Sequence, residues 1–271
     1  MPELPEVETT LKGVTPWTLG ERISAIKVHN ASLRWPIPEA VNNLQGLTIR
    51  RVYRRAKYLL FELSDGQHLM IHLGMSGVIR VVSQQAELLK HDHFEMYLSN
   101  QRVMRLNDPR RFGCVLLVGK EPNKHVLLEK LGPEPLTDEF DGLWLKTLSK
   151  DKKGPVKNFI MNNHVVVGVG NIYAAESLFL SGIHPKRSAR NISLKRYEKL
   201  AKNIKKVLSQ AITAGGTTLN DFKNTDGKPG YFKQELNVYG RAGAPCVQCG
   251  RAIKNLVIGQ RASCYCGNCQ T

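Results

Sequence analysis

The pattern of apolar and polar positions along the 271 residues changes character twice. Near the N-terminus Val7, Leu11 and Val14 recur at helical spacing, which predicts a helix over residues 3 to about 14. From about residue 20 to about residue 120, apolar and polar residues alternate in short runs separated by Gly, Asn, Asp or Ser, as in strands. The predicted strands are 22–29, 48–63, 68–75, 77–82, 93–98 and 102–106. They indicate a mostly antiparallel β domain, either a sandwich or a flattened barrel.

The second change follows a segment rich in proline and acidic residues, 130–141, which we interpret as a linker. Beyond it the apolar positions recur with a helical period. One helix is predicted to begin at Pro155 and a second to end at Gly182, because proline suits a first helical turn and glycine a C-cap. The longest helix is predicted from an N-cap at Ser193 to a stop at Gly215. Its expected buried stripe consists of Leu194, Tyr197, Leu200, Ile204, Val207, Leu208 and Ala211.

Five of the six cysteines lie close to the C-terminus. Cys246 and Cys249 form one CxxC pair, and after 16 residues Cys266 and Cys269 form another. Each pair presents two thiolates from one turn, so the spacing predicts a closed, four-coordinate structural zinc site. Cys264 is an extra thiol that could replace Cys266 as a ligand, but its spacing to the neighbouring cysteines argues against this.

The residues between the two pairs, 253–265, are predicted to form a β-hairpin. Its turn lies near Gly259, Gln260 and Arg261, which would place Arg261 at an exposed tip. So small a hairpin cannot build a core, and the metal would supply its folding energy. A rigid hairpin with a basic tip suits contact with phosphate, although Arg261 on its own could be no more than a solvated turn residue.

Composition indicates a polyanionic partner. Lysine and arginine number 39 and aspartate and glutamate 23, a net charge of +16 that is spread along the chain. This imbalance favours a folded basic surface that binds nucleic acid. The sequence contains no apolar run near the roughly 18 residues of a membrane span and no pattern of a signal peptide. We therefore expect a cytoplasmic protein without a membrane partner or a disulfide framework.

The first residues carry candidate catalytic groups. Glu3 and Glu6 are three positions apart and share one face of the predicted helix. If Met1 is removed, Pro2 becomes a terminal secondary amine, and an α-amino pKa of roughly 8 leaves part of it neutral near pH 7. Such an amine could attack a sugar carbon covalently. The alternative is that Pro2 and Pro5 only shape the entry to the helix.

Two turns and one basic stretch carry further candidates. Lys57 ends a basic run directly before an apolar strand, so it could be held at a domain edge or simply be solvated. Met75, between glycines, could be a wedge between bases or a buried residue under a turn. Arg110, Arg111 and Phe112 share a probable turn, where cations could hold phosphate or a base edge while the ring stacks.

Three other features remain open from the residues alone. His91 and His93 could bind a metal, contact phosphate or be structural. Asn171 begins a predicted helix after a glycine-rich segment, and a helix N-terminus can bind phosphate. The polar, glycine-rich segment 215–232 is either disordered or a lid over a site.

Taken together and in order, these segments resemble the bacterial formamidopyrimidine-DNA glycosylases, the 8-oxoguanine DNA glycosylases with AP lyase activity. The resemblance runs from end to end of the chain. It is carried by PELPEVET, RRAKYLL, HLGMSG, HDH, DPRRFG, LGPEPL, VVGVGNIYAAE, GGTTL with DGKPGYF, QELNVYGR and the finger with two CxxC pairs.

The resemblance implies an α+β fold with DNA bound in a cleft between domains. The expected domains are an N-terminal antiparallel β-sandwich catalytic domain over 1–130 and a linker over 131–154. A helix-two-turn-helix DNA-binding domain with a lesion-capping loop over 155–235 and a zinc-finger β-hairpin over 236–271 complete the chain.

The resemblance also assigns catalytic roles. Pro2 would attack C1′ of the damaged nucleoside and form a Schiff base, with Glu3 as the general acid–base. Glu6 would orient the active site. Lys57 would serve β-elimination and contact phosphate, and Arg261 would bind phosphate and serve δ-elimination.

Further residues match positions that contact DNA in the family, namely His91, Arg110, Lys152 and Asn171. Met75, Arg110 and Phe112 match the triad that fills the void left by the extruded base, with Arg110 facing the orphaned cytosine. Thr217, Thr218, Lys228 and Tyr231 fall in the lesion-capping loop. The zinc ligands would be Cys246, Cys249, Cys266 and Cys269.

The implied activity is base excision repair, that is, removal of 8-oxoguanine and formamidopyrimidines from duplex DNA and β,δ-elimination at the abasic site. The expected enzyme is a nucleoid-associated monomer with one zinc ion and no nucleotide cofactor. Two alternatives stand beside this one. The sister enzyme endonuclease VIII prefers oxidised pyrimidines, but ELPEVE rather than EGPE and the DPRRFG turn argue against it. A non-catalytic zinc DNA-binding protein would need neither Pro2 nor Glu3.

Overall fold

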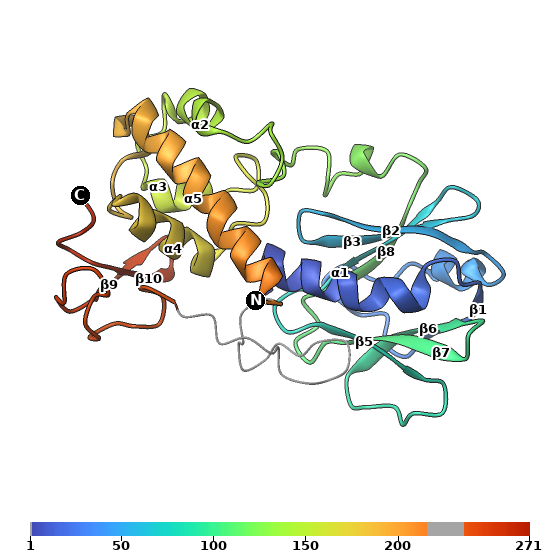
Figure 1. Cartoon of the computed structure of the whole chain (residues 1–271). Coiled ribbons are helices and arrows are strands. Elements are labelled where there is room, and N and C mark those ends of the chain that lie inside the picture. The colour runs from blue at the N-terminus through green and yellow to red at the C-terminus, as the bar shows by residue number, and fades with distance from the viewer. Residues whose placement is uncertain (1, 216–235) are drawn as a thin grey trace. The chain divides into compact units, whose positions relative to one another are not determined.

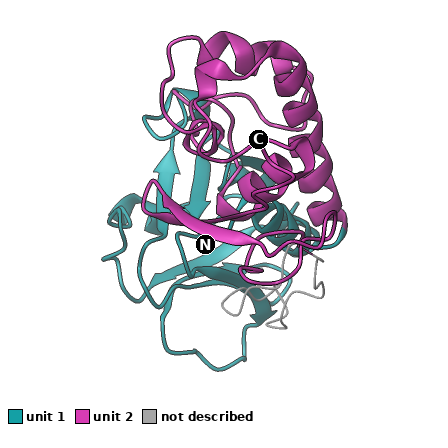
Figure 2. Ribbon diagram, turned by 90° about the vertical axis from the view of Figure 1, so that its left-hand side faces the viewer, with its two compact units in different colours: residues 1–129, 214–233 teal, residues 130–213, 234–271 magenta. Residues whose placement is uncertain are grey.

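The structure, a computed structural model, describes residues 2–215 and 236–271. They fall into two compact units, shown in different colours in Figure 2. The first comprises residues 1–129 and 214–233 and the second 130–213 and 234–271, as far as the structure describes them. The mixture of antiparallel sheets, a helical region and a C-terminal hairpin confirms the α+β expectation.

In its described residues the first unit combines the α-helix α1 and two short 3-10 helices with two four-stranded antiparallel sheets (Figure 1). One sheet has the strand order β1-β6-β7-β5 and the other β2-β3-β4-β8. The elements are α1 (Leu4–Thr18), β1 (Ile23–Val28), the 3-10 helix η1 (Glu39–Leu44), β2 (Ile49–Arg55), β3 (Tyr58–Leu63), β4 (His68–His72), β5 (Val78–Ser83), β6 (Asp92–Leu98), β7 (Arg102–Asn107), β8 (Cys114–Val118) and η2 (Pro122–Lys124).

Both sheets contribute to one buried core. Phe61 and Ile71 from one sheet and Phe94 and Met104 from the other are completely buried in the same apolar cluster, to which α1 adds Val7. The sheets therefore form a sandwich, one of the two architectures that the alternating pattern left open.

The structure corrects two details of the strand prediction. The run 48–63 is a hairpin of β2 and β3, because the chain turns at Ala56 and Lys57, where Ala56 has a left-handed φ of 52°. No glycine or asparagine marks this turn, so the sequence pattern did not reveal it. The strand β8 was also missed, since its run of apolar residues has no alternation.

Two adjacent segments connect the sheets. Residues 73–77 lead from β4 in one sheet to β5 in the other, and residues 108–113 lead from β7 back to β8. Because β4 pairs with β8 and β5 with β7, the two crossing segments begin and end on hydrogen-bonded neighbours. Residues that are far apart in the sequence therefore meet at this point.

The second unit combines helices with a zinc-finger hairpin. Its elements are α2 (Gly142–Ser149), α3 (Val156–Ile160), α4 (Asn171–Ser181), η3 (Ala189–Asn191), α5 (Leu194–Thr213), β9 (Lys254–Ile258) and β10 (Arg261–Tyr265). The long helix α5 packs against α2 and α4. The predicted ends at Gly182 and near Gly215 are confirmed, and Gly182 has the left-handed conformation of a C-cap.

Two expectations for this unit were incomplete or wrong. Helix α2 was not predicted, although Asp141 caps it by accepting a hydrogen bond from the Trp144 backbone N–H at 2.7 Å. Leu194, assigned to the buried stripe of α5, is 40% exposed because it begins the helix, where packing partners are fewer. The other six stripe positions are buried.

Candidate active site and zinc centre

The N-terminus of α1 holds two buried carboxylates next to the candidate nucleophile. Pro2 is buried, and Glu3 and Glu6 are 3% and 0% exposed. The two glutamates form a capping box, in which the Glu3 backbone N–H donates to Glu6 Oε2 at 2.9 Å and the Glu3 side chain accepts from the Glu6 N–H. The positive end of the helix dipole favours such carboxylates. Glu6 thus fixes the backbone of Glu3, and through it the position of the neighbouring Pro2.

Lys57 lies in the turn between β2 and β3 with only 9% of its surface exposed. Its charge acts on His72, the last residue of β4. Burial first, and then the positive charges of Lys57 and Arg34, lower the pKa of His72 to about 4. His72 Nδ1 accepts a hydrogen bond from the Gly74 N–H at 3.0 Å, as a neutral imidazole can. The structure therefore couples Lys57 to a neutral histidine that the sequence analysis did not single out.

His72 also lines a cavity of about 140 Å³. Burial raises the pKa of the Cys114 thiol in its wall to about 11, so this thiol is a core group rather than a nucleophile. Aromatic side chains form most of the lining, which consists of Arg34, Trp35, Tyr58, His72, Phe112, Cys114 and Leu127.

The two crossing segments present the three candidate wedge residues. Met75 is 37% and Phe112 42% exposed, so the alternative of a buried methionine does not hold. The exposed Arg110 places its guanidinium 4.8 Å from the centre of the Phe112 ring, a cation–π contact.

His91 lies in the turn before β6 with a left-handed φ of 74°. Its ring stands edge-on to that of His93 with the centroids 6.0 Å apart. His93 is buried, and its Nε2 donates to the Asp108 carbonyl at 2.9 Å. A metal site at this pair is not supported, because the cluster of possible ligands found in residues 2–215 and 236–271 is the cysteine group.

In the second unit, Asn171 contacts the strand β10, whose first residue is Arg261. Asn171 begins α4, and its Nδ2 donates to the Ala262 carbonyl of β10 at 3.1 Å. Arg261 is the first residue of β10, exposed directly after the turn at Gly259 and Gln260. The turn residues have φ values of 55° and 62°, as in a tight two-residue hairpin.

Two further residues of this unit, Lys152 and Glu176, differ in their burial. Lys152, which follows α2, is exposed. Glu176 on α4 was missed by the sequence analysis, yet its buried carboxylate accepts the backbone N–H groups of Asn237, Val238 and Tyr239 at 2.8–2.9 Å. The predicted capping-loop residues Thr217, Thr218, Lys228 and Tyr231 lie outside the described residues.

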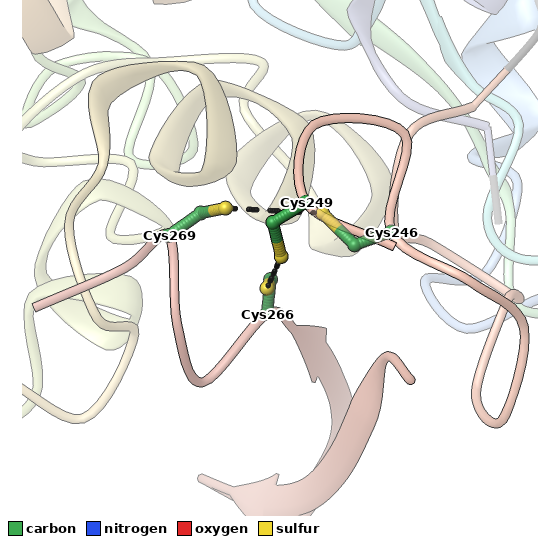
Figure 3. Close-up of side chains that lie close together, drawn as sticks. All are labelled: Cys246, Cys249, Cys266 and Cys269. Atoms are coloured by element: carbon green, nitrogen blue, oxygen red, sulfur yellow. Dashed lines mark hydrogen bonds between the residues drawn. The ribbon is translucent and has the colours of Figure 1, made fainter. Parts of the chain in front are cut away.

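The four predicted zinc ligands converge (Figure 3). Their sulfur atoms all lie within 4.8 Å of one another, with 3.9 Å between Cys246 and Cys269 and 3.5 Å between Cys249 and Cys266. A tetrahedral Zn²⁺ with Zn–S bonds of about 2.3 Å sets its sulfurs about 3.8 Å apart. The donor set therefore fits a structural zinc ion, and no ligand position is left for a substrate.

Family models match most of the chain. The formamidopyrimidine-DNA glycosylase N-terminal domain matches residues 1–115, the formamidopyrimidine-DNA glycosylase H2TH domain residues 131–223, and the zinc finger found in FPG and IleRS residues 243–271. The chain belongs to the formamidopyrimidine-DNA glycosylase family. It is accordingly a DNA glycosylase of base excision repair, and its finger holds one structural zinc ion.

Relatives and solved structures agree with this family assignment. The chain is 55% identical over 271 residues to the formamidopyrimidine-DNA glycosylase of Marinobacter nauticus, with all of both chains covered. It is 57% identical over 270 residues to that of Alcanivorax borkumensis, again with full coverage of both.

Among solved structures, the MutM (Fpg) protein of Thermus thermophilus has a TM-score of 0.89 and 35% identity over 99% of this chain and 98% of that one. The Lactococcus lactis Fpg in complex with DNA containing Fapy-dG has a TM-score of 0.90 and 31% identity, covering 99% of this chain and 100% of that one.

Proposed function

We propose that this glycosylase removes oxidised purines, 8-oxoguanine and formamidopyrimidines, from duplex DNA and then cleaves the abasic strand. The observation that carries the proposal is the buried N-terminal arrangement in which Pro2 directly precedes the interlocked carboxylates Glu3 and Glu6. The capping box that joins Glu3 to Glu6 also fixes the backbone next to the buried Pro2, the candidate nucleophile. The complexes of related Lactococcus lactis proteins with DNA containing Fapy-dG and with abasic DNA support the choice of substrate.

In the proposed first step the Pro2 amine bonds to C1′ while the glycosidic bond breaks. The departing base takes the bonding electrons and a proton, and we propose Glu3 as the acid that supplies protons to the base or the sugar ring. Opening of the sugar gives an iminium between Pro2 and C1′. Glu6 acts through its hydrogen bond to the Glu3 N–H and is a positioning residue.

The iminium then acts as an electron sink for strand cleavage. Loss of a proton from C2′ expels the 3′-phosphate in β-elimination, for which we propose Lys57 as the second amine. Lys57 is only 9% exposed, and its positive charge contributes to the low pKa of His72, so a neutral imidazole lies near this amine. Arg261, exposed on the hairpin end, would bind phosphate and assist δ-elimination, which expels the 5′-phosphate.

The remaining residues would bind and deform double-stranded DNA. We propose phosphate or base contacts for His91, Arg110, Lys152 and Asn171, and the net charge of +16 supports such a partner. A glycosidic bond inside a duplex is out of reach, so the nucleotide must be extruded at a cost of a few kcal/mol. Met75, Arg110 and Phe112 would fill the resulting gap, and the loop with Thr217, Thr218, Lys228 and Tyr231 would cover the extruded base.

We propose that the protein acts as a monomer, because a single copy carries every residue named. We also propose that it is associated with the nucleoid. None of the helices in the part of the chain that the structure describes is long and apolar enough to cross a membrane.

Borohydride trapping on a duplex with one 8-oxoguanine opposite cytosine, followed by peptide mass spectrometry, tests the proposal. We expect the cross-link on Pro2, which also requires removal of Met1. A cross-link on Lys57 would reverse the assignment of the two amines, and intact DNA binding without a cross-link would refute the Schiff-base mechanism.

Two controls separate the alternatives. A duplex containing thymine glycol should be cleaved more slowly than the 8-oxoguanine duplex, whereas the opposite order would indicate the specificity of endonuclease VIII. An uncleaved N-terminal tag should abolish cleavage and spare DNA binding, since a tag blocks only the amine of Pro2.

A further inference from the structure

The side chain of Asp108 links the two crossing segments that carry the wedge residues. Asp108 is completely buried at the start of segment 108–113. Its Oδ1 accepts a hydrogen bond from Ser76 Oγ, in the other segment, at 2.9 Å. Its Oδ2 accepts the Gly113 N–H at 2.8 Å and so closes its own segment. The Asp108 carboxylate thus joins the start and the end of segment 108–113 and also binds the Ser76 side chain of segment 73–77.

The backbone of Asp108 is held as firmly as its side chain. Its N–H donates to the His91 carbonyl at 3.0 Å, and its carbonyl accepts from the Arg111 N–H at 3.1 Å and from His93 Nε2 at 2.9 Å. A buried carboxylate is retained only when its oxygens are well satisfied. Asp108 therefore connects the Met75 loop, the Phe112 loop and the turn of His91.

The two loops also touch through their backbones. A Cβ atom built at Gly74 would lie 2.4 Å from the Phe112 carbonyl carbon, and one built at Gly113 would lie 2.6 Å from the His72 carbonyl oxygen. Any side chain at these positions would push the segments apart. The glycines permit the close approach, and the bond between Ser76 and Asp108 joins the segments across it.

We propose that Ser76 and Asp108 are positioning residues that make Met75 and Phe112 act as one rigid wedge during extrusion of the damaged base. The inference rests on the proposed function, since it concerns how the wedge works. Met75 lies next to Ser76, and Phe112 lies next to Gly113, whose N–H is bound to the same carboxylate. A side chain that replaces a stacked base must resist displacement, and anchoring both wedge residues on one buried group supplies that resistance.

A double-mutant cycle measures the coupling between the two wedge residues. Single-turnover excision of 8-oxoguanine is compared for the unaltered chain, Met75→Ala, Phe112→Ala and the double variant, each with serine or alanine at position 76. With Ser76 present, we expect the fold loss of excision rate in the double variant to differ from the product of the two single fold losses by about fivefold or more. In the Ser76→Ala background, the fold loss of excision rate in the double variant should equal the product of the single fold losses to within about twofold.

Ser83→Ala, which removes an exposed hydroxyl from β5 in the same unit, is the matched control and should leave the coupling unchanged. A coupling that is the same with and without the Ser76 hydroxyl would overturn the inference while leaving the wedge intact. If neither Met75→Ala nor Phe112→Ala slows excision at all, the wedge itself fails, which is a recognisably different result.

A second measurement separates positioning from simple loss of stability. When the lesion lies opposite an abasic position, base pairing no longer opposes extrusion. Ser76→Ala should therefore slow excision from the fully paired duplex by about five- to tenfold, and excision opposite the abasic position by less than about twofold. Equal slowing on both duplexes would contradict a role in extrusion.

Discussion

The ammonium group of Lys157 lies 2.6 Å from Asn171 Oδ1. The same group donates to Ser263 Oγ at 2.6 Å and to the Ala262 carbonyl at 3.0 Å, and Lys157 is 1% exposed. A buried charge in α3 therefore joins the first residue of α4 to the zinc-finger strand β10. It fixes the side chain of Asn171 and the strand that begins at Arg261, two of the proposed DNA contacts.

Replacing this lysine should damage both stability and DNA binding. Lys157→Met keeps the volume of the side chain but leaves the oxygens of Asn171 and Ser263 without their donor. We expect the free energy of unfolding to fall by about 1–3 kcal/mol and affinity for abasic-site DNA to weaken. Denaturant unfolding and binding titrations measure the two effects, with the exposed Lys153→Met as control. Unchanged affinity would mean that Asn171 and Arg261 need no such support.

Phe112→Ala should slow excision of 8-oxoguanine more than it weakens binding to an abasic site. In the proposed wedge the ring would compensate for the lost stacking only when a base is extruded, and unstacking costs a few kcal/mol, which corresponds to about 10- to 100-fold in rate. Single-turnover excision and titration with abasic DNA give the comparison. Equal losses in both assays would argue against a wedge.

Lys152→Ala should weaken DNA binding and lower its dependence on salt. Each phosphate contact that is lost reduces the slope of log K against log salt by about 0.9. Binding titrations at several salt concentrations give the slope, and the exposed Lys199→Ala on α5 controls for loss of one charge. A slope that matches the unaltered chain would remove Lys152 from the phosphate contacts.

His72 should make the stability of the protein depend on pH. Burial, with the charges of Lys57 and Arg34, lowers its pKa from the ordinary 6.5 to about 4, so the unfolded chain takes up a proton at a higher pH than the folded one. The contribution is therefore fully present above about pH 6.5 and is lost as the pH falls towards 4.

The measurement for His72 compares the unaltered chain with His72→Gln. Between pH 7 and pH 4.5 the unfolding free energy of the unaltered chain should fall by about 2 kcal/mol more than that of the variant. His125→Gln, at a half-buried site in the same unit, is the control. Parallel losses in the unaltered chain and in His72→Gln would show that His72 is not the group responsible.

Removal of zinc should unfold the finger, because its hairpin has little core of its own and the metal supplies folding energy on the order of 10 kcal/mol. Treatment with a thiol-modifying reagent and a chelator should release one zinc ion per chain and abolish DNA binding. Atomic absorption and binding titrations measure both. Cys264→Ser should retain the full zinc content, since Cys264 is not among the four clustered thiols; loss of zinc from this variant would revise the ligand set.

Local patterns predicted much of this protein. Alternation of side chains identified most of the strands, the helical period identified α4 and α5, and two CxxC pairs identified the zinc site. These features depend on residues within a few positions of one another, so the sequence displays them directly. The helix α2 and the strand β8 were missed because short elements with weak periodicity resemble loops or core segments.

Tertiary structure alone decided what surrounds the candidate residues. The sequence does not show that Asp108 meets Ser76, that Lys157 meets Asn171 and Ser263, or that Lys57 acts on a neutral His72. Each of these relationships joins separate elements, and the pairing of strands and packing of helices bring them together. The sequence by itself determined which chemical groups the protein has and where its elements form. Only the fold determined which of those groups share a buried environment, because burial and proximity arise from contacts between distant parts of the chain.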